Sequence, residues 1–224
     1  MRIGGGERSL EAQRAAMVAD QLRARGVRDE RVLKAMGEVP RELFVPDGRR
    51  DQAYADEALP IEAGQTISQP YIVARMTELL AVRPGDRILE IGTGSGYQAA
   101  ILAKLGARVT TVERQSDLIP QARARLEELG LADGVEFRTG DGSKGLPEGA
   151  PWPRIIVTAA APGIPRTLRE QLDPNGGRMV IPVGSRDRQD LLVVVRQGDE
   201  WIERSDGPCV FVPLIGSEGF HYDA

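Results

Sequence analysis

Hydrophobic positions follow two different spacings along the chain. Over residues 9–81 apolar side chains recur at the three- and four-residue spacing of helices, with Ser9 as a candidate cap and Gly26 and Gly37 as expected stops. After residue 82, short β-branched runs alternate with helical patterns. Such alternation is typical of parallel strands joined by helices. We therefore expect an α/β fold, a doubly wound and mostly parallel sheet with a helical N-terminal extension.

The individual elements can be placed from turn residues and periodicity. Helices are expected at 9–25, 29–36, 70–80, 97–105, 116–129 and 165–172, and strands at 87–91, 107–112, 135–138, 154–158 and 178–183. The last runs, 191–196, 201–204 and 210–212, resemble strands joined by turns. Strands in that arrangement predict an antiparallel edge at the C-terminal end of the sheet.

Length and composition favour one domain. The chain has 224 residues, of which 41% are hydrophobic, enough for one sizeable core. Residues 1–8 are polar and rich in glycine, so we expect a disordered tail. Residues 9–224 would then form a single domain, with an extension and substrate-side loop over 9–81 and a cofactor-binding sheet over 82–224.

Charge and cysteine content narrow the function classes. The net charge is −4 with both signs mixed along the chain, which disfavours a nucleic-acid partner. The single Cys209 cannot form an internal disulfide, and no apolar run reaches the roughly 18 residues of a membrane span. The first residues lack the apolar core of a secretory signal. We expect a cytoplasmic protein that does not bind membranes.

A glycine-rich turn follows the first strand of the expected sheet. Gly92, Gly94 and Gly96 are spaced G-x-G-x-G, and Tyr97 stands where a dinucleotide fingerprint has its third glycine. The acidic Glu90 before the turn would repel a pyrophosphate, which argues against NAD or FAD. It suits the ammonium group of S-adenosyl-L-methionine. The expected cofactor contacts in this stretch are Glu90, Gly92, Thr93, Gly94 and Ser95.

Acidic residues also follow the next two strands. Glu113 ends the second strand, where its carboxylate can accept hydrogen bonds from both ribose hydroxyls. Asp141 and Gly142 follow the third strand, where an acid can accept from the adenine amino group. Taken alone, Glu113 could be a helix-capping acid and Asp141 a turn former. Their shared position at one edge of the sheet favours a binding site.

The stretch Gly64–Tyr71 lies upstream of the glycine turn and is expected to fold back over the ligand. Its Ser68 stands just before Pro70, at or next to a helix N-cap, and capping is the alternative to a role in binding. The only histidine, His221, lies near the end of the chain. A serine hydrolase or a metal centre built on histidine is therefore hard to assemble, and we expect no metal.

Five motifs together carry a resemblance that spans about Val18 to Ile215. They are Gly64–Pro70, Leu89–Ala100, Gly140–Gly142, Ile155–Ala160 and Phe211–Leu214. With these motifs the chain resembles the protein-L-isoaspartate O-methyltransferase family. It departs from many relatives at Trp152 and Pro153, where they have Phe-Asp, and at Ser143, near which they have tryptophan.

The resemblance implies a function and roles for particular residues. The enzyme would methylate the free carboxyl group of isoaspartyl residues in damaged proteins, yielding S-adenosyl-L-homocysteine and an ester that closes to a succinimide. Ser68 would be the active-site residue, with Thr66, Ile67 and Gln69 lining the substrate pocket and the Val212 backbone contacting the substrate. Such a substrate is already an anion at neutral pH and needs no general base. We expect a monomer whose partners are isoaspartyl peptides and proteins.

Two alternatives remain at this stage. A base methyltransferase would resemble its relatives in an Asn/Asp-Pro-Pro-aromatic motif after the fourth strand, where this chain has Thr158–Pro162. A non-catalytic module that senses S-adenosyl-L-methionine would need no Ser68 motif. Methyl transfer to matched isoaspartyl and aspartyl peptides distinguishes these alternatives.

Overall fold

A seven-stranded sheet forms the centre of the computed structural model, which describes residues 9–221. The disordered tail expected at residues 1–8 lies outside this range. The strands lie in the order β5-β4-β3-β6-β7-β8-β9. Their bounds are β3 Arg87–Ile91, β4 Arg108–Glu113, β5 Val135–Thr139, β6 Arg154–Val157, β7 Asn175–Gly184, β8 Gln189–Gln197 and β9 Glu200–Cys209. Strands β3 to β7 pair in parallel and β8 and β9 antiparallel, which confirms the expected sheet.

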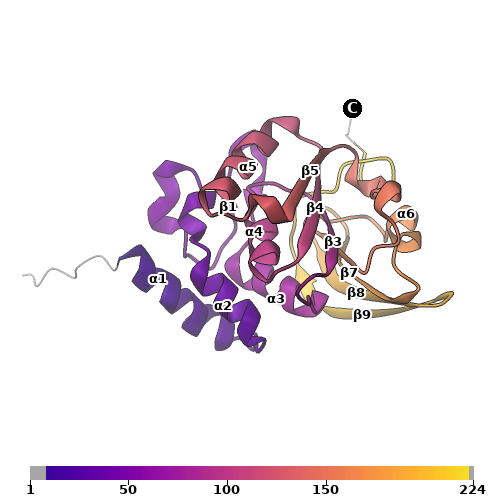
Figure 1. Ribbon diagram of the computed structural model, residues 1–224, viewed down its shortest axis with the longest axis horizontal. Helices are drawn as coiled ribbons and strands as arrows, with labels where there is room; N and C mark the ends of the chain where they lie inside the picture. Colours follow the sequence, from indigo (N-terminus) through magenta and orange to yellow (C-terminus); the bar gives the residue numbers. More distant parts are fainter. Residues whose placement is uncertain (1–8, 222–224) are drawn as a thin grey trace, which may run out of the picture.

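Helices cover the two faces of the sheet unequally. Successive side chains of β3 point to opposite faces of the sheet. Ile88 therefore belongs to one buried cluster, and Leu89 and Ile91 belong to the other. The first cluster includes apolar side chains of α3 (Pro70–Leu80), α4 (Tyr97–Lys104) and α5 (Ile119–Glu128). The second is covered by the short α6 (Arg166–Glu170) and by loops. Figure 1 shows α4 and α5 on one side of the sheet and α6 on the other.

The N-terminal extension consists of helices that pack beside α3 and α4. Helix α1 (Leu10–Ala16) begins at Ser9, whose hydroxyl accepts a hydrogen bond from the Ala12 amide, and it continues as a π-helical segment over Met17–Arg23. Helix α2 spans Glu30–Glu38 (Figure 1). The expected stop at Gly37 is wrong, because this glycine keeps helical geometry and its open side faces Val18.

Short elements connect the extension to the sheet. Strands β1 (Leu59–Pro60) and β2 (Thr66–Ile67) form a small antiparallel hairpin just before α3. This hairpin fixes the approach of the Ser68 stretch to the start of the helix. The remaining turns are 3-10 helices at Arg41–Phe44, Asp47–Gln52, Glu62–Gly64, Ser116–Leu118, Ala132–Gly134, Gly142–Lys144 and Pro147–Gly149.

The end of the chain differs from the expected strands at 201–204 and 210–212. Strand β9 runs without interruption over Glu200–Cys209, with one register shift opposite β8. After it the chain leaves the sheet and crosses the end of β6. There the Ala160 amide donates to the Val212 carbonyl at 2.8 Å, and the Leu214 amide donates to the Ala160 carbonyl at 2.7 Å. The chain after β9 therefore lies against the carboxyl edge of the sheet.

One cluster of buried apolar residues runs from Met17 in the extension to Phe211 beyond β9. The extension and the sheet therefore pack around the same core. Among residues 9–221, no helix combines the length and the apolar character needed to cross a bilayer.

Candidate active site

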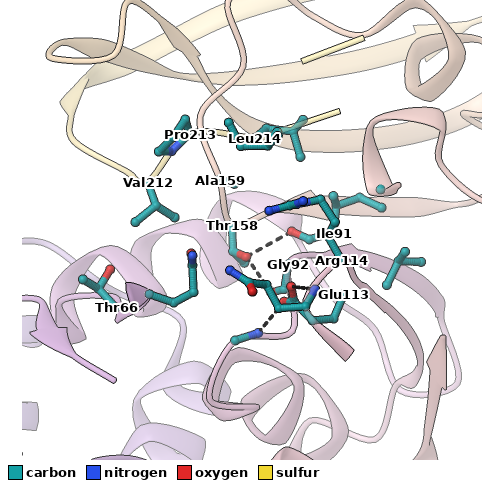
Figure 2. Close-up of a pocket in the computed structure, with 16 residues that line it drawn as sticks. Thr66, Ile91, Gly92, Glu113, Arg114, Thr158, Ala159, Val212, Pro213 and Leu214 are labelled. Atoms are coloured by element: carbon teal, nitrogen blue, oxygen red, sulfur yellow. Dashed lines mark hydrogen bonds between the residues drawn. The ribbon is translucent and has the colours of Figure 1, made fainter. Parts of the chain in front are cut away.

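A cleft opens at the carboxyl ends of β3, β4 and β6. The strand order changes direction at β3, since β4 and β5 lie on one side of it and β6 and β7 on the other. In open α/β sheets this is the position at which ligands bind. We call this opening the cofactor cleft. Figure 2 shows Gly92 and Glu113 on one side, Val212, Pro213 and Leu214 on the other, and Thr158 between them.

The glycine turn approaches β6 too closely for any other residue. Gly92, Gly94 and Gly96 have φ values of 97°, 51° and 88°, a region that side chains disfavour. A Cβ atom on residue 92 would lie 2.4 Å from the Thr158 hydroxyl. That hydroxyl donates to the Gly92 carbonyl at 2.6 Å. The turn therefore leaves space for a ligand above it while it remains fixed to the neighbouring strand.

Glu113 lies in the cofactor cleft as expected, at the end of β4. One carboxylate oxygen accepts from the Gly94 amide at 3.0 Å and the other from the Gln115 amide at 2.8 Å. Each oxygen keeps a second lone pair. The carboxylate is thus held rigidly and can still accept from two neighbouring hydroxyl groups.

Glu90 lies beneath the glycine turn rather than in the cleft. Its side chain is fully buried, and its two carboxylate oxygens have no hydrogen-bond partner within residues 9–221. The alternation of side chains along β3 turns it toward the α3 and α4 face, with Thr111 of β4 as its cross-strand neighbour. Burial raises the pKa of the Glu90 carboxyl to about 8. This differs from the expectation of direct contact with a cationic ligand.

Asp141 and Gly142 occupy different positions relative to the cleft. Gly142 lines it, whereas the Asp141 side chain accepts four hydrogen bonds from elsewhere. One oxygen accepts from the amide and hydroxyl of Ser143, the other from the amide and hydroxyl of Ser217. Burial opposes ionisation, but these bonds outweigh it and hold the pKa of Asp141 below its usual value. Each Asp141 oxygen has two lone pairs, and the four bonds use all of them. No lone pair is left for the expected bond from an adenine amino group.

A smaller inner hollow lies behind the glycine turn. It is lined by the turn and by the start of α3 and α4, and includes the predicted contacts Thr93 and Ser95. Both side chains are buried: the Thr93 hydroxyl bonds that of Thr111 at 2.7 Å, and the Ser95 hydroxyl accepts from the Tyr97 amide at 3.3 Å. Their hydroxyls shape the turn, and their contribution to a ligand is through the backbone that they hold.

Ser68 stands where the inner hollow meets a larger outer groove. It lines both cavities, and its hydroxyl has no hydrogen-bond partner in the described part of the chain. Helix α3 has Gln69, not Ser68, at its N-cap, and no side chain caps it. Capping is therefore not the role of this hydroxyl. The Ser68 side chain is half-buried and free to bind a ligand group.

The outer groove has apolar walls with charged residues at its rim. Its lining includes Ser68, Tyr71, Ile72, Phe211 and Val212, with Arg25, Asp56, Glu57 and Arg188 among the charged residues. The rim is partly fixed, since Arg25 pairs with Asp56 at 2.6 Å and lies over the Tyr71 ring at 3.6 Å.

The other predicted substrate contacts are distributed over these cavities. Thr66 lines all three, Gln69 lines the outer groove, and the buried Ile67 lines the inner hollow. The Gln69 amide side chain donates to the Asp56 carbonyl at 2.9 Å and so orients the groove. The Val212 carbonyl is bonded to Ala160, whereas its amide has no partner among residues 9–221. This amide is the backbone group that Val212 can offer to a ligand.

Sequence reasoning missed several residues of the site. Thr158 lines all three cavities, and Leu214 and Ile215 close one end of the cofactor cleft. Thr158 could have been found, because it directly follows the fourth strand, as Glu113 ends the second. Leu214 belongs to the Phe211–Leu214 motif but was given no role of its own, and Ile215 gave no signal, since only the crossing of the chain over β6 brings them to the cleft.

The residues of the cleft fit S-adenosyl-L-methionine. Glu113 offers two acceptors, the glycine turn offers backbone amides and space, and Leu214 and Ile215 offer an apolar wall beside Gly142. These match a ribose, an amino-acid chain and an adenine ring, respectively. Within the lining of the cleft, Arg114 is the only basic residue. The negative charges of a pyrophosphate would therefore be poorly neutralised there.

Comparison with known proteins agrees with this arrangement. The family model for protein-L-isoaspartate(D-aspartate) O-methyltransferase matches residues 12–219. Curated proteins named protein-L-isoaspartate O-methyltransferase include one from Methylorubrum populi, 54% identical over 93% of this chain and 98% of its own length. Another, from Methanopyrus kandleri, is 51% identical over 91% of this chain and 92% of its own length.

Solved structures give the same result. A protein-L-isoaspartate O-methyltransferase superposes with a TM-score of 0.79 at 31% identity, covering 92% of this chain and 67% of its own. A structure from Plasmodium falciparum assigned to the same enzyme, in complex with S-adenosyl-L-homocysteine, has a TM-score of 0.75 at 25% identity and covers 90% and 98%. This chain therefore belongs to the protein-L-isoaspartate(D-aspartate) O-methyltransferase family.

Proposed function

We propose that the protein transfers the methyl group of S-adenosyl-L-methionine to the free carboxyl group of L-isoaspartyl residues in peptides and damaged proteins. The family to which the chain belongs supports this reaction. The observation in the structure that carries it is the unpartnered Ser68 hydroxyl between the inner hollow and the outer groove. A donor at that boundary can hold a substrate group in the groove against a cofactor in the cleft.

The methyl acceptor in the proposed reaction is a carboxylate. Its ordinary pKa is near 4, so it is ionised at neutral pH and no residue has to remove a proton. The protein then needs donors that orient the anion rather than a base. The Ser68 hydroxyl and the Val212 amide are two such donors, and both lie on the lining of the outer groove.

Exclusion of water is the second task of the groove. Tyr71, Ile72 and Phe211 supply apolar surface around the Ser68 hydroxyl. In such surroundings a hydrogen bond to an anion is stronger than in water, and the reacting oxygen keeps one orientation. The Ser68 hydroxyl and the Val212 amide should hold the same carboxylate oxygen and leave the other free, because a donor on each oxygen would weaken the nucleophile.

The cofactor is held by the carboxyl edge of the sheet. Glu113 accepts from the ribose hydroxyls, Gly92 and Gly94 border the amino-acid part, and Leu214 and Ile215 cover the far end of the cleft. When bound, S-adenosyl-L-methionine supplies an electrophilic methyl group on a positively charged sulfur. Thr158, Thr66 and Gly92 surround the place where the cleft joins the hollow, and they define where that group can lie.

The test is methyl transfer from isotopically labelled cofactor to two peptides that differ only in isoaspartate or aspartate at one position. We expect label in the isoaspartyl peptide alone, in a base-labile ester. Labelling of neither peptide, with cofactor binding intact, would contradict the proposal and favour a sensor of S-adenosyl-L-methionine. Equal labelling of both would contradict the stated substrate.

We also propose that the protein acts as a monomer in the cytoplasm. The residues that the proposed reaction uses, Ser68, Glu113 and Val212, line neighbouring cavities of the same chain, and the reaction as proposed requires no residue of a second copy. The net charge of −4 with mixed signs gives no support for a nucleic-acid partner. Light scattering on the purified protein checks the mass of 24.3 kDa expected for one chain.

A further inference from the structure

Asp141 is the centre of a polar network that reaches the end of the described chain. Its two oxygens accept from Ser217 at 2.8 Å (amide) and 3.0 Å (hydroxyl), and from Ser143 at 3.0 Å (amide) and 2.7 Å (hydroxyl). The Ser143 hydroxyl accepts in turn from the Glu218 amide at 3.0 Å. The turn after β5 is therefore bonded to residues 217 and 218, more than 70 positions later in the sequence.

The same segment is fastened to α6. The Glu218 carboxylate accepts from both the amide, at 2.9 Å, and the hydroxyl of Thr167, near the start of that helix. Charge-assisted bonds of this kind are stronger than those between neutral groups. Residues 217 and 218 thus join two elements of the sheet's second face.

Two glycines let the segment approach these partners. A Cβ atom on residue 216 would lie 2.0 Å from the Asp141 carboxylate, and one on residue 219 would lie 2.1 Å from the Leu214 carbonyl. The Phe220 amide closes the turn by donating to the Leu214 carbonyl at 2.7 Å. The fold of the segment Leu214–Phe220 is consequently well defined, although it contains neither helix nor strand.

This segment presents two side chains to the cofactor cleft. Leu214 and Ile215 line it, on the side of Gly142, while Ser217 is exposed and lies outside the lining. The network is therefore placed behind the wall that the ligand would touch. The carboxylates of Asp141 and Glu218 therefore hold the wall in place and do not contact the ligand themselves.

We propose that Asp141, together with Ser143 and Ser217, positions the segment Leu214–Phe220 as the wall against which the adenine ring of the cofactor binds. The inference rests on the proposed function, because it concerns the cofactor of that reaction. It assigns Asp141 the role of a positioning residue rather than that of an adenine acceptor. Cofactor affinity should depend on the network, while the clamp for the acceptor at Ser68 should not.

The first test measures the affinity for S-adenosyl-L-homocysteine by calorimetry in Ser217→Ala and Ser217→Asp. The alanine variant loses one of four bonds to Asp141, and the aspartate variant adds a like charge beside it. We expect weakening of a few-fold and of about tenfold or more, respectively. The KM for the isoaspartyl peptide and kcat at saturating cofactor should remain within about twofold.

A matched control is Ser205→Ala, since Ser205 is an exposed serine on β9 whose hydroxyl accepts a hydrogen bond from the Gly207 amide. It should bind S-adenosyl-L-homocysteine as the parent does. Parental affinity for S-adenosyl-L-homocysteine in Ser217→Asp would overturn the inference. A rise in the KM for the peptide by the same factor as the loss of affinity would overturn it too. A parent protein that fails to bind S-adenosyl-L-homocysteine would instead overturn the proposed function itself.

Hydrogen exchange tests the inference without any substitution. The amides of Ser217 and Glu218 donate to Asp141 and Ser143. If the segment forms the wall of the adenine site, S-adenosyl-L-homocysteine should slow exchange at these amides in the parent protein. Exchange that is unchanged by the ligand at these two positions, while it slows at Gly94, would overturn the inference.

Discussion

The hydroxyl of Thr158 shares its one proton between the carbonyl oxygens of Gly92, at 2.6 Å, and Ile91, at 3.0 Å. It thereby fastens the end of β6 to the glycine turn after β3. Because Thr158 lines all three cavities, this fastening point is also where they converge.

Replacing Thr158 with valine keeps the shape of the side chain and removes these bonds. The loss should lower the free energy of unfolding by about 0.5–1.5 kcal/mol and weaken cofactor binding several-fold, because the turn loses its support. Thermal unfolding and calorimetry measure the two effects. Unaltered cofactor affinity at reduced stability would show that the bond supports the fold alone.

Substituting Ser68 with alanine removes the donor at the boundary of the hollow and the groove. A hydrogen bond to a charged group contributes about 1.5–3 kcal/mol, so kcat/KM on an isoaspartyl peptide should fall roughly ten- to a hundredfold. The affinity for S-adenosyl-L-homocysteine should be retained, because Ser68 is absent from the lining of the cofactor cleft. Parental turnover in this variant would be incompatible with the proposed clamp.

Glu113→Gln tests the ribose contact. The substitution keeps the size of the side chain but places an NH₂ group against the amide of Gly94 or Gln115, which donate to the two oxygens in the parent. The affinity for S-adenosyl-L-homocysteine should fall by about 1.5–3 kcal/mol. Peptide saturation at high cofactor concentration should be unaffected. Equal affinity in variant and parent would remove Glu113 from the cofactor site.

Glu90→Gln should change the pH dependence of stability. Burial raises the pKa of Glu90 to about 8, whereas an unfolded glutamate titrates near about 4.3. Between these values the folded protein holds a proton that the unfolded chain releases, so this contribution to stability is lost as pH rises toward about 8. Glutamine does not titrate, and the melting temperature of the variant should therefore increase relative to the parent between about pH 5 and 8.

Thermal unfolding of the variant and the parent, measured side by side between about pH 5 and 8, tests this prediction. A difference in melting temperature that does not vary with pH would show that Glu90 is ionised in the folded protein. Glu90→Gln should also weaken cofactor binding less than Glu113→Gln, because the Glu90 carboxylate lies outside the cleft.

The succession of strands and helices along the chain and the position of the glycine turn could be predicted from local patterns. Parallel strands leave their carboxyl ends at one edge, so Gly92, Glu113 and Gly142 had to converge wherever the sheet formed. The structure brings all three to the cofactor cleft. Ser68 was identified by its motif, and the structure places it at the boundary of two cavities.

What could not be predicted depends on contacts distant in the sequence. Position alone cannot show that Asp141 already has four donors, because two of them come from Ser217. The direction of the Glu90 side chain depends on how β3 packs in the sheet, so its place next to the turn in the sequence could not show that it lies outside the lining of the cleft. Residues 210–212 have strand-forming composition, yet the chain leaves the sheet at Cys209.

The measurement that tests the central claim most directly is a crystal structure with S-adenosyl-L-homocysteine and an isoaspartyl peptide bound together. The account predicts the isoaspartyl carboxylate within hydrogen-bond distance of the Ser68 hydroxyl and the Val212 amide, facing the cofactor sulfur beside Thr158 with no water between them. A carboxylate bound elsewhere, or protein or water between it and the sulfur, would contradict the account.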